Sequence, residues 1–329
     1  MKDSHKRKNL VDIIIPTFNR SSTLDRAIQS VFNQEFKEYI LWVVDDGSTD
    51  NSLMVLKKWQ PLFPAQKMQI IQLHKNKGVS IARNTGIRAG KAPWLAFLDS
   101  DDEWMEQKLQ QQIKWTTEHP QYPLIHTEEL WIRKTTPNLY RNKSFQNFSF
   151  LYKKKEPTEK PIPYESGEGA AGIKIDLYKR VNQKKKHQKK GGRVFIDNLD
   201  MCRISPSSVI VKRAFLNKIG LFREDFPVCE DYELWLRVSS QTEVGFIKKP
   251  LIIKYGGHSN QLSQKYKAMD EWRVRAMASH LDNPSISKEE KQKLIDILNK
   301  KCQILLNGYK KHNNYKNTEE IKQIYNLTI

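Results

Sequence analysis

The first third of the chain alternates between short apolar runs and segments whose apolar residues recur every three or four positions. The runs are typical of strands buried on both faces, and they occupy residues 10–15, 39–44, 68–73 and 93–98. The intervening segments predict helices, at residues 24–32, 53–59, 79–89 and 103–118. Ser22 and Asp25 have the spacing of a capping box for the first of these helices. This alternation predicts an α/β fold with a doubly wound, mostly parallel sheet.

The alternation stops near Trp131, where the composition of the chain changes. Residues 134–193 hold 16 Lys or Arg, 5 Asp or Glu and four prolines, so we expect an irregular basic insertion that acts as a lid. Further elements are expected as strands over 204–211 and 246–255, and as helices from near 213, over 231–239 and from 266 onward. Ser287 and Glu290 predict a second capping box in this C-terminal helical part.

Charge and cysteine usage narrow the class of protein. The chain of 329 residues has a formal net charge of +19, which favours partners such as nucleic acid, anionic lipid headgroups or acidic substrates. Its three cysteines are scattered and lack CxxC spacing, which argues against a disulfide framework or a thiolate zinc site. We see no signal peptide and no apolar run near the roughly 18 residues that cross a bilayer. We therefore expect a cytoplasmic protein.

Two acidic clusters follow predicted strands. Asp45-Asp46 comes after the second strand, and Asp99-Ser100-Asp101-Asp102 comes after the fourth. Ligands of α/β proteins bind at the carboxyl ends of the strands, and crowded carboxylates favour binding of a cation. The first cluster also reads as an ordinary Asp-Gly-Ser turn. A helix cap needs only one acid, so the second cluster leaves a metal role open beside capping.

Two further positions carry candidate chemistry. Glu230-Asp231 lies at the start of a predicted helix, where a carboxylate could act as a general base or simply cap the helix. His258 follows Gly256-Gly257 and is a candidate ligand for a metal or a diphosphate, although a surface histidine is the simpler interpretation. The chain has no GxGxxG and no Walker A motif, which argues against a dinucleotide oxidoreductase or a P-loop NTPase.

The order of several motifs is more specific than any one of them. The segments VDIIIPTFNR, VVDDGSTDNS, NKGVSIARNTGIRAG, WLAFLDSDDEW and CEDYELWLRV follow one another along the chain. In this order they resemble the family 2 glycosyltransferases with the GT-A fold, of the bacterial surface-glycan type. The resemblance is close over residues 10–112, returns over 204–263 and is absent from 135–183.

The resemblance implies a role for each matching residue. In the nucleotide pocket, Pro16, Thr17 and Phe18 would line the base site, Asp46 would accept a hydrogen bond from uracil, Asp45 would support the turn, and Arg83 and Asn84 would lie beside the nucleotide. Asp99 would contact the ribose or waters of the metal, and Asp101 would ligate Mn²⁺ or Mg²⁺. His258, proposed above from the residues alone, is a further candidate ligand of the metal. Asp231 would be the catalytic base, with Glu230 as its neighbour.

The resemblance also implies a GT-A-like domain organisation. We expect a basic tail at 1–9, a nucleotide-sugar-binding half at 10–133, the insertion at 134–193, an acceptor-side half at 194–262 and a helical extension at 263–329.

The implied reaction is an inverting, metal-dependent transfer of a hexosyl or N-acetylhexosaminyl group. The donor would be a nucleotide diphosphate sugar, most simply a UDP-sugar, and the acceptor a hydroxyl of a surface glycan or lipid-linked glycan. Basic segments would hold the protein at the inner face of an anionic membrane.

An alternative is a basic membrane- or nucleic-acid-binding protein whose glycosyltransferase domain is impaired. Nucleic acid is disfavoured as a partner because the basic tract lacks a binding module. A sugar-nucleotide pyrophosphorylase is disfavoured because Pro16-Thr17-Phe18-Asn19 stands where a Gly-rich loop is expected.

Overall fold

A computed structural model describes residues 10–133, 188–256, 269–313 and 317–328 of the chain. Within these residues one sheet of eight strands has the order β3-β2-β1-β4-β7-β6-β8-β5. The strands are β1 (Val11–Thr17), β2 (Tyr39–Asp45), β3 (Met68–Gln72), β4 (Trp94–Phe97), β5 (Glu103–Trp104), β6 (Leu124–Arg133), β7 (Ile210–Lys212) and β8 (Gly245–Gly256). The predicted α/β class and mostly parallel sheet are confirmed, since four of the seven strand pairings are parallel.

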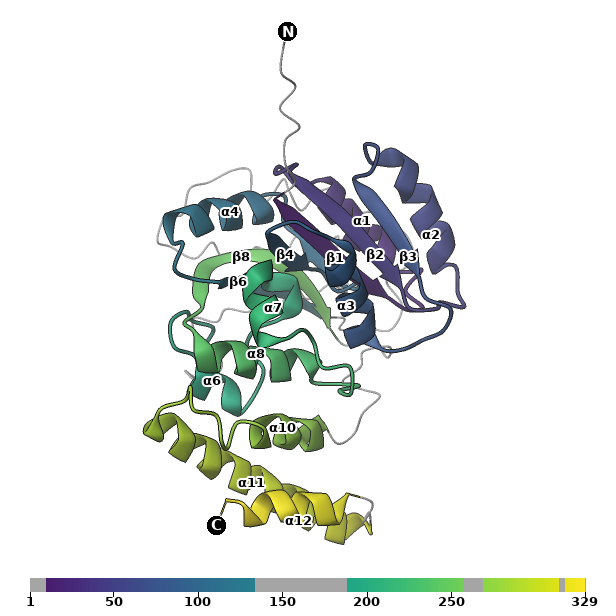
Figure 1. Ribbon diagram of the computed structural model, residues 1–329. Coiled ribbons are helices and arrows are strands. Elements are labelled where there is room, and N and C mark those ends of the chain that lie inside the picture. Colours follow the sequence, from purple (N-terminus) through teal and green to yellow (C-terminus); the bar gives the residue numbers. More distant parts are fainter. Residues whose placement is uncertain (1–9, 134–187, 257–268, 314–316, 329) are drawn as a thin grey trace, which may run out of the picture.

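Helices cover both faces of this sheet (Figure 1). Packed on one face are α1 (Leu24–Phe32), α2 (Ser52–Trp59) and α4 (Lys108–Glu118). On the other face lie α3 (Val79–Ala89), α7 (Arg213–Ile219) and α8 (Glu230–Gln241). The far side of α8 contacts a third layer made of α6 (Phe195–Leu199), α10 (Met269–Ala278), α11 (Lys288–His312) and α12 (Thr318–Asn326). Short 3₁₀ turns lie at η1 (Gln60–Leu62) and η4 (Pro206–Ser208).

Strand register brings the candidate residues to one edge of the sheet. Thr17 at the end of β1 pairs with Asp45 at the end of β2, and Ile14 of β1 pairs with Phe97 at the end of β4. Because these strands are parallel, the loops that carry Phe18, Asp46 and the acidic cluster after β4 leave the sheet on the same side. The fold therefore places three sequence-distant motifs around one space.

Three local expectations were wrong. The segment 103–118 begins with the short strand β5, which pairs with β8, and the helix starts only at Lys108. The strand expected over 204–211 is shortened to β7, because residues 206–208 form a 3₁₀ turn. No capping box starts α1; the N-cap is Thr23, and the Asp25 carboxylate accepts a hydrogen bond from the indole of Trp59 on α2 instead.

A further expectation is confirmed, and another falls on residues that the structure does not describe. The capping box formed by Ser287 and Glu290 is confirmed at the start of α11. The ten-residue strand β6 had not been expected. Most of the predicted lid, residues 134–187, lies outside the described residues. No helix among those described combines the length and the apolar character needed to cross a membrane.

Candidate active site

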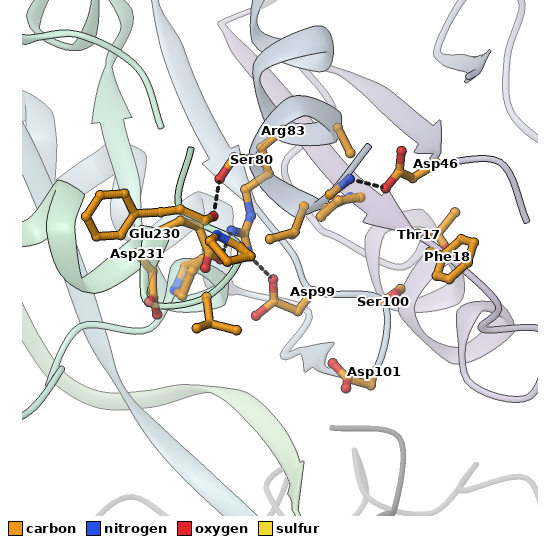
Figure 2. A pocket seen from close by; sticks show the side chains of 18 of the residues that line it. Thr17, Phe18, Asp46, Ser80, Arg83, Asp99, Ser100, Asp101, Glu230 and Asp231 are labelled. Atoms are coloured by element: carbon orange, nitrogen blue, oxygen red, sulfur yellow. Dashed lines mark hydrogen bonds and ion pairs between the residues drawn. The ribbon is translucent and has the colours of Figure 1, made fainter. Parts of the chain in front are cut away.

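A cavity of about 730 Å³ opens at the edge of the sheet where β1, β2 and β4 end. Figure 2 shows side chains from three of its walls facing this space. Of the predicted residues, those that line it are Pro16, Thr17, Phe18, Asp46, Arg83, Asp99, Asp101, Glu230 and Asp231. Asp45 and Asn84 are buried behind the wall, and His258 lies outside the described residues. The cavity thus gathers residues from five of the sequence motifs.

The carboxylate of Asp46 connects two loops on one side of the cavity. Its Oδ1 accepts the backbone N–H of Lys77 at 2.8 Å, and its Oδ2 accepts that of Gly78 at 2.8 Å. Burial raises the pKa of Asp46, and the two backbone donors oppose that rise. Gly78 adopts a φ of +97°, which an L side chain rarely tolerates, so this contact depends on a glycine. A carboxylate has further lone pairs, so Asp46 can still accept a hydrogen bond from a ligand.

Asp45 stabilises the turn that presents Asp46. Its Oδ1 accepts the backbone N–H of Ser48 at 3.2 Å, and its side chain is fully buried. Gly47, which precedes Ser48, has a φ of +74°, and a Cβ added to it would lie 2.7 Å from the backbone of Lys75. Close packing against the β3–α3 loop therefore requires glycine at this turn.

Arg83, on α3, joins two acidic segments across the floor of the cavity. Its guanidinium lies 2.7 Å from Oδ1 of Asp99 and 2.6 Å from Oε1 of Glu230, and its side chain is only 4% exposed. Burial would lower the pKa of Arg83, but the two carboxylates outweigh that effect and raise it. Because both carboxylates already pair with Arg83, this side chain fixes the loop after β4 relative to the start of α8.

Asn84, the next residue, faces away from the cavity. Its amide donates to the carbonyl of Phe222 at 2.8 Å and to Glu224 at 2.9 Å, and its Oδ1 accepts the N–H of Phe222 at 3.2 Å. These bonds fasten the loop that leads into α8 onto α3.

Glu230 and Asp231 open α8 at the edge of the cavity. Cys229, the N-cap, is left-handed with a φ of 60°, and this turns the chain sharply into the helix. Oδ1 of Asp231 accepts the N–H of Tyr232 at 2.7 Å, and Oδ2 lies 3.7 Å from the sulfur of Cys202. Burial raises the pKa of Asp231, against the influence of Arg83. Burial likewise raises the pKa of Glu230 to about 7, although Arg83 acts against it.

The acids after β4 divide into two groups. Asp102 turns into the protein, where its Oδ2 accepts from the hydroxyl of Ser207 at 2.6 Å and from the ammonium of Lys254 at 2.8 Å. Burial raises the pKa of Asp102 to about 7, and the Lys254 ammonium opposes that rise. Asp102 borders the cavity with a side chain that is only 3% exposed, whereas the Asp99 side chain is 24% exposed, and Asp99 and Asp101 face the cavity (Figure 2). Asp102 therefore holds the loop, while the other two acids present oxygen atoms to a ligand.

The described residues fit a metal ion that arrives together with a phosphorylated ligand. Among them, no three His, Cys, Asp or Glu side chains are grouped closely enough to hold an ion alone. Mg²⁺ in proteins is commonly bound by one or two carboxylates, with phosphate and water oxygens completing its coordination. Asp99 and Asp101, on one loop facing a large cavity, supply the oxygen ligands that such an ion prefers.

Sequence reasoning missed the supports of this loop. Lys254 and Tyr255 at the end of β8 line the cavity, and Arg26 of α1 donates to the backbone carbonyl of Asp101 at 2.8 Å. The Arg26 guanidinium also lies 3.5 Å from the centre of the Tyr255 ring. The sequence indicates Lys254 and Tyr255 only by their position at the end of a predicted strand, and it gives no indication of the role of Arg26.

Comparison with curated proteins finds glycosyltransferases. The chain is 26% identical over 278 residues to the Escherichia coli "UDP-Glc:alpha-D-GlcNAc-diphosphoundecaprenol beta-1,3-glucosyltransferase WfgD", covering 84% of this chain and 88% of that protein. It is 44% identical over 105 residues to the Staphylococcus aureus (strain N315) "Poly(ribitol-phosphate) beta-N-acetylglucosaminyltransferase TarP", covering 30% of this chain and 31% of TarP. Three of the curated relatives are matched over only 43%, 28% and 31% of their lengths.

Comparison with solved structures finds the same fold. S. aureus TarS 1-349 in complex with UDP-GlcNAc superposes with a TM-score of 0.58 at 16% identity, covering 96% of this chain and 91% of that one. The mannosyltransferase PcManGT from Pyrobaculum calidifontis, in complex with GDP-Man and Mn²⁺, superposes with a TM-score of 0.53 at 12% identity, covering 98% and 85%. The family model described as "Glycosyl transferase family 2" matches residues 12–180, which is more than half of the chain. The chain therefore belongs to glycosyl transferase family 2, with the GT-A-like fold of that family.

Proposed function

We propose that this protein is an inverting, metal-dependent glycosyltransferase that uses a UDP-sugar and a hydroxyl of a surface glycan or lipid-linked glycan. One observation carries the proposal: Asp46, Asp101 and Asp231, from three separate segments, line a single cavity. The names of the relatives support the donor class, since WfgD is named as using UDP-Glc and TarS was solved with UDP-GlcNAc.

The nucleotide would bind at the carboxyl ends of β1 and β2. Thr17 and Phe18 follow β1, and the Phe18 ring would stack on the uracil while Asp46 accepts its N3–H. Asp99 would contact the ribose, and Asp101 would ligate Mn²⁺ or Mg²⁺. When bound, the ion would neutralise charge that develops on the diphosphate leaving group. In the described contacts, Arg83 acts through Asp99 and Glu230, so we assign it and Asn84 as positioning residues.

Asp231 would deprotonate the acceptor hydroxyl. As that oxygen bonds to the anomeric carbon, the bond from this carbon to the diphosphate oxygen breaks, and the proton moves to Asp231. Attack from the face opposite the leaving group inverts the anomeric configuration. The raised pKa of Asp231 makes it a stronger base than an exposed aspartate. This open, carboxylate-lined cavity favours the enzyme over the alternative of an impaired domain in a basic binding protein.

A donor panel tests the proposal. Release of nucleotide diphosphate would be measured for UDP-glucose, UDP-N-acetylglucosamine, UDP-galactose and GDP-mannose, with Mn²⁺, with Mg²⁺ and with chelator. We expect turnover of a UDP-sugar that chelator abolishes and that Asp101→Asn lowers by about a hundredfold or more. Asp282→Asn, at an exposed position, is the matched control. Turnover of no donor would overturn the function, and turnover unaffected by chelator would overturn the metal requirement alone.

A further inference from the structure

A second cavity of about 510 Å³ adjoins the first. It lies between the loop before α8 and the helices α10 and α12, and its lining includes Arg223, Trp272 and Glu320. Asp225 and Phe226 line both cavities, so the two cavities meet at these residues. The loop that carries them continues directly into Glu230 and Asp231. The second cavity therefore adjoins the side of the active site where the acceptor hydroxyl would meet its base.

Aromatic rings and guanidinium groups alternate in this second cavity. The Arg223 guanidinium lies 4.5 Å from the centre of the Phe226 ring, whose edge meets Trp272 at a centroid distance of 5.3 Å. The Arg275 guanidinium lies 4.5 Å from the centre of a Trp272 ring. Cation–π and edge-to-face contacts of this kind hold aromatic rings in a fixed orientation. The cavity thus has a preformed aromatic wall.

The charges of this cavity are balanced in pairs. Arg223 pairs with the carboxylate of Asp225, and Arg275 makes two bonds of 2.7 Å to the carboxylate of Glu320. Two cations and two anions leave no excess charge to attract a phosphate or a carboxylate. They do supply N–H donors and oxygen acceptors beside apolar rings. Hydroxyl groups, which both donate and accept, match this set of partners.

We propose that the second cavity binds the sugar ring next to the acceptor residue, so that the enzyme recognises an uncharged glycan of at least two sugars. This inference rests on the proposed function, because it takes the first cavity as the donor site. The C–H faces of a pyranose ring pack on Phe226 and Trp272, and its hydroxyl groups bond to the paired charged side chains. The glycosidic bond between this ring and the reacting sugar would cross the loop 220–229 where Asp225 and Phe226 border both cavities.

Fluorine NMR of the full chain labelled with 5-fluorotryptophan tests this assignment. Trp272 lines the second cavity and Trp131 the first, so each cavity has its own reporter. Trp272→Leu and Trp131→Phe assign the two signals. The probes are cellobiose, lactose, maltose and N,N′-diacetylchitobiose, with glycerol 3-phosphate as the anionic probe and UDP with Mn²⁺ as the donor-site probe. Trp59, on α2, is the internal control.

We expect at least one disaccharide to shift the Trp272 signal without moving Trp59. Trp272→Leu lacks this reporter, so its affinity is measured by titration calorimetry beside the native chain, and we expect binding to weaken about tenfold. The inference is overturned if no disaccharide shifts Trp272, if glycerol 3-phosphate shifts it more than any disaccharide does, or if Trp272→Leu binds as the native chain does. UDP with Mn²⁺ tests the donor site separately, through the Trp131 signal. If UDP does not shift Trp131 and no donor is turned over, the proposed function is contradicted, while the sugar site is judged from Trp272 alone.

Discussion

At the scale of single residues, the cavity depends on carboxylates whose protonation is controlled by burial. Asp231 has a raised pKa because it is buried, and Arg83 restrains that rise. Glu230 beside it has a pKa raised to about 7 for the same reasons. Two acids this close titrate as a pair, so the pH dependence expected of the proposed reaction belongs to both.

We expect Asp231→Asn to lower kcat by about 10²–10⁴-fold, the usual contribution of a general base, with little change in donor KM. A base acts only when deprotonated, so kcat of the native enzyme should fall as the pH drops through the raised pKa of the pair. The measurement is the pH profile of nucleotide release for both forms. A variant that keeps native kcat would remove Asp231 from the mechanism.

The shared ion pairs of Arg83 make a second prediction. Arg83→Met leaves Glu230 and Asp99 without their cation, and loss of one partner of a buried pair costs roughly 3–5 kcal/mol. The free energy of unfolding would be measured by denaturant titration. Removing a cation that lowers the pKa of Glu230 and Asp231 should also move the acid limb of the pH profile to higher pH.

The control for this prediction lies on the same helix. Arg88 of α3 pairs with Glu224 at 3.0 Å, but its side chain is 60% exposed. An exposed pair contributes about 1 kcal/mol or less, so Arg88→Met should leave both stability and the pH profile nearly unchanged. Equal effects of the two substitutions would show that burial and the shared carboxylates do not explain the role of Arg83.

At the scale of elements, a glycine at the end of α3 allows this helix end to pack closely against Asp12 of β1. A Cβ added at Gly90 would lie 2.3 Å from Oδ2 of Asp12. That oxygen accepts from the N–H of Ala92 at 2.7 Å and lies 2.6 Å from the Arg213 guanidinium, so it has little freedom to move. We expect Gly90→Ala to lower the free energy of unfolding by about 2–4 kcal/mol, as overpacking and a disturbed buried pair do.

Gly308 provides the matched control for this substitution. It lies in α11, where an added Cβ would meet nothing within 4 Å. Because glycine is a poor residue for a helix interior, Gly308→Ala should raise stability by up to about 1 kcal/mol. Thermal or denaturant unfolding of both variants measures the contrast. Destabilisation by Gly308→Ala to the same extent would rule out the contact with Asp12 as the cause.

Local patterns located the elements that are long enough to carry one. The helices α1 to α3 were predictable because their apolar residues repeat with the helical period, and the strands β1 to β4 because each is a nearly continuous apolar run. The strand β5 was not, since two residues carry no period and Glu103 is held by the hydroxyl of Tyr255 at 2.7 Å. Asp25 has capping-box spacing from Ser22, yet it bonds to Trp59, a partner 34 positions away.

In the candidate site too, residues marked by a local pattern could be predicted, whereas contacts between distant residues could not. Asp46, Asp99 and Asp231 could be predicted because they follow or begin periodic elements, and all three line the cavity. The sequence does not show that Arg83 lies between Asp99 and Glu230, because those partners are 16 and 147 positions away. Nor does it reveal that Lys254, on strand β8, is the partner of Asp102. Contacts of this kind exist only after the sheet has formed.

At the scale of the whole molecule, α8 runs from the cavity to the C-terminal helices. Leu234, Trp235 and Val238 face the layer beside the sheet, whereas Tyr232 and Leu236 belong to the core shared with α10 and α11. Figure 1 shows this third layer beyond α8, at the end of the molecule opposite to the N-terminal strands. Since α8 begins at Glu230-Asp231, the C-terminal layer helps to position the proposed base.

The outer side of that layer leads to the last prediction, which concerns a membrane surface. Lys293, Lys300 and Lys311 are exposed on α11, and their spacing of about two and three turns places them on one side of the helix. Ile304, 57% exposed, lies near the same side. Each basic residue near an anionic bilayer contributes on the order of 1 kcal/mol. We expect the protein, with its net charge of +19, to sediment with phosphatidylglycerol vesicles at low salt.

Two comparisons distinguish a surface on α11 from the effect of net charge alone. Replacing Lys293, Lys300 and Lys311 by glutamine should weaken binding to the vesicles far more than the same change at Lys57, Lys114 and Lys218, which are exposed on other elements. Binding should also fall as salt rises, because the Debye length shrinks to about 8 Å at physiological ionic strength. Equal effects of the two triple variants would assign the attraction to total charge, and an absence of sedimentation even at low salt would contradict a membrane-bound state.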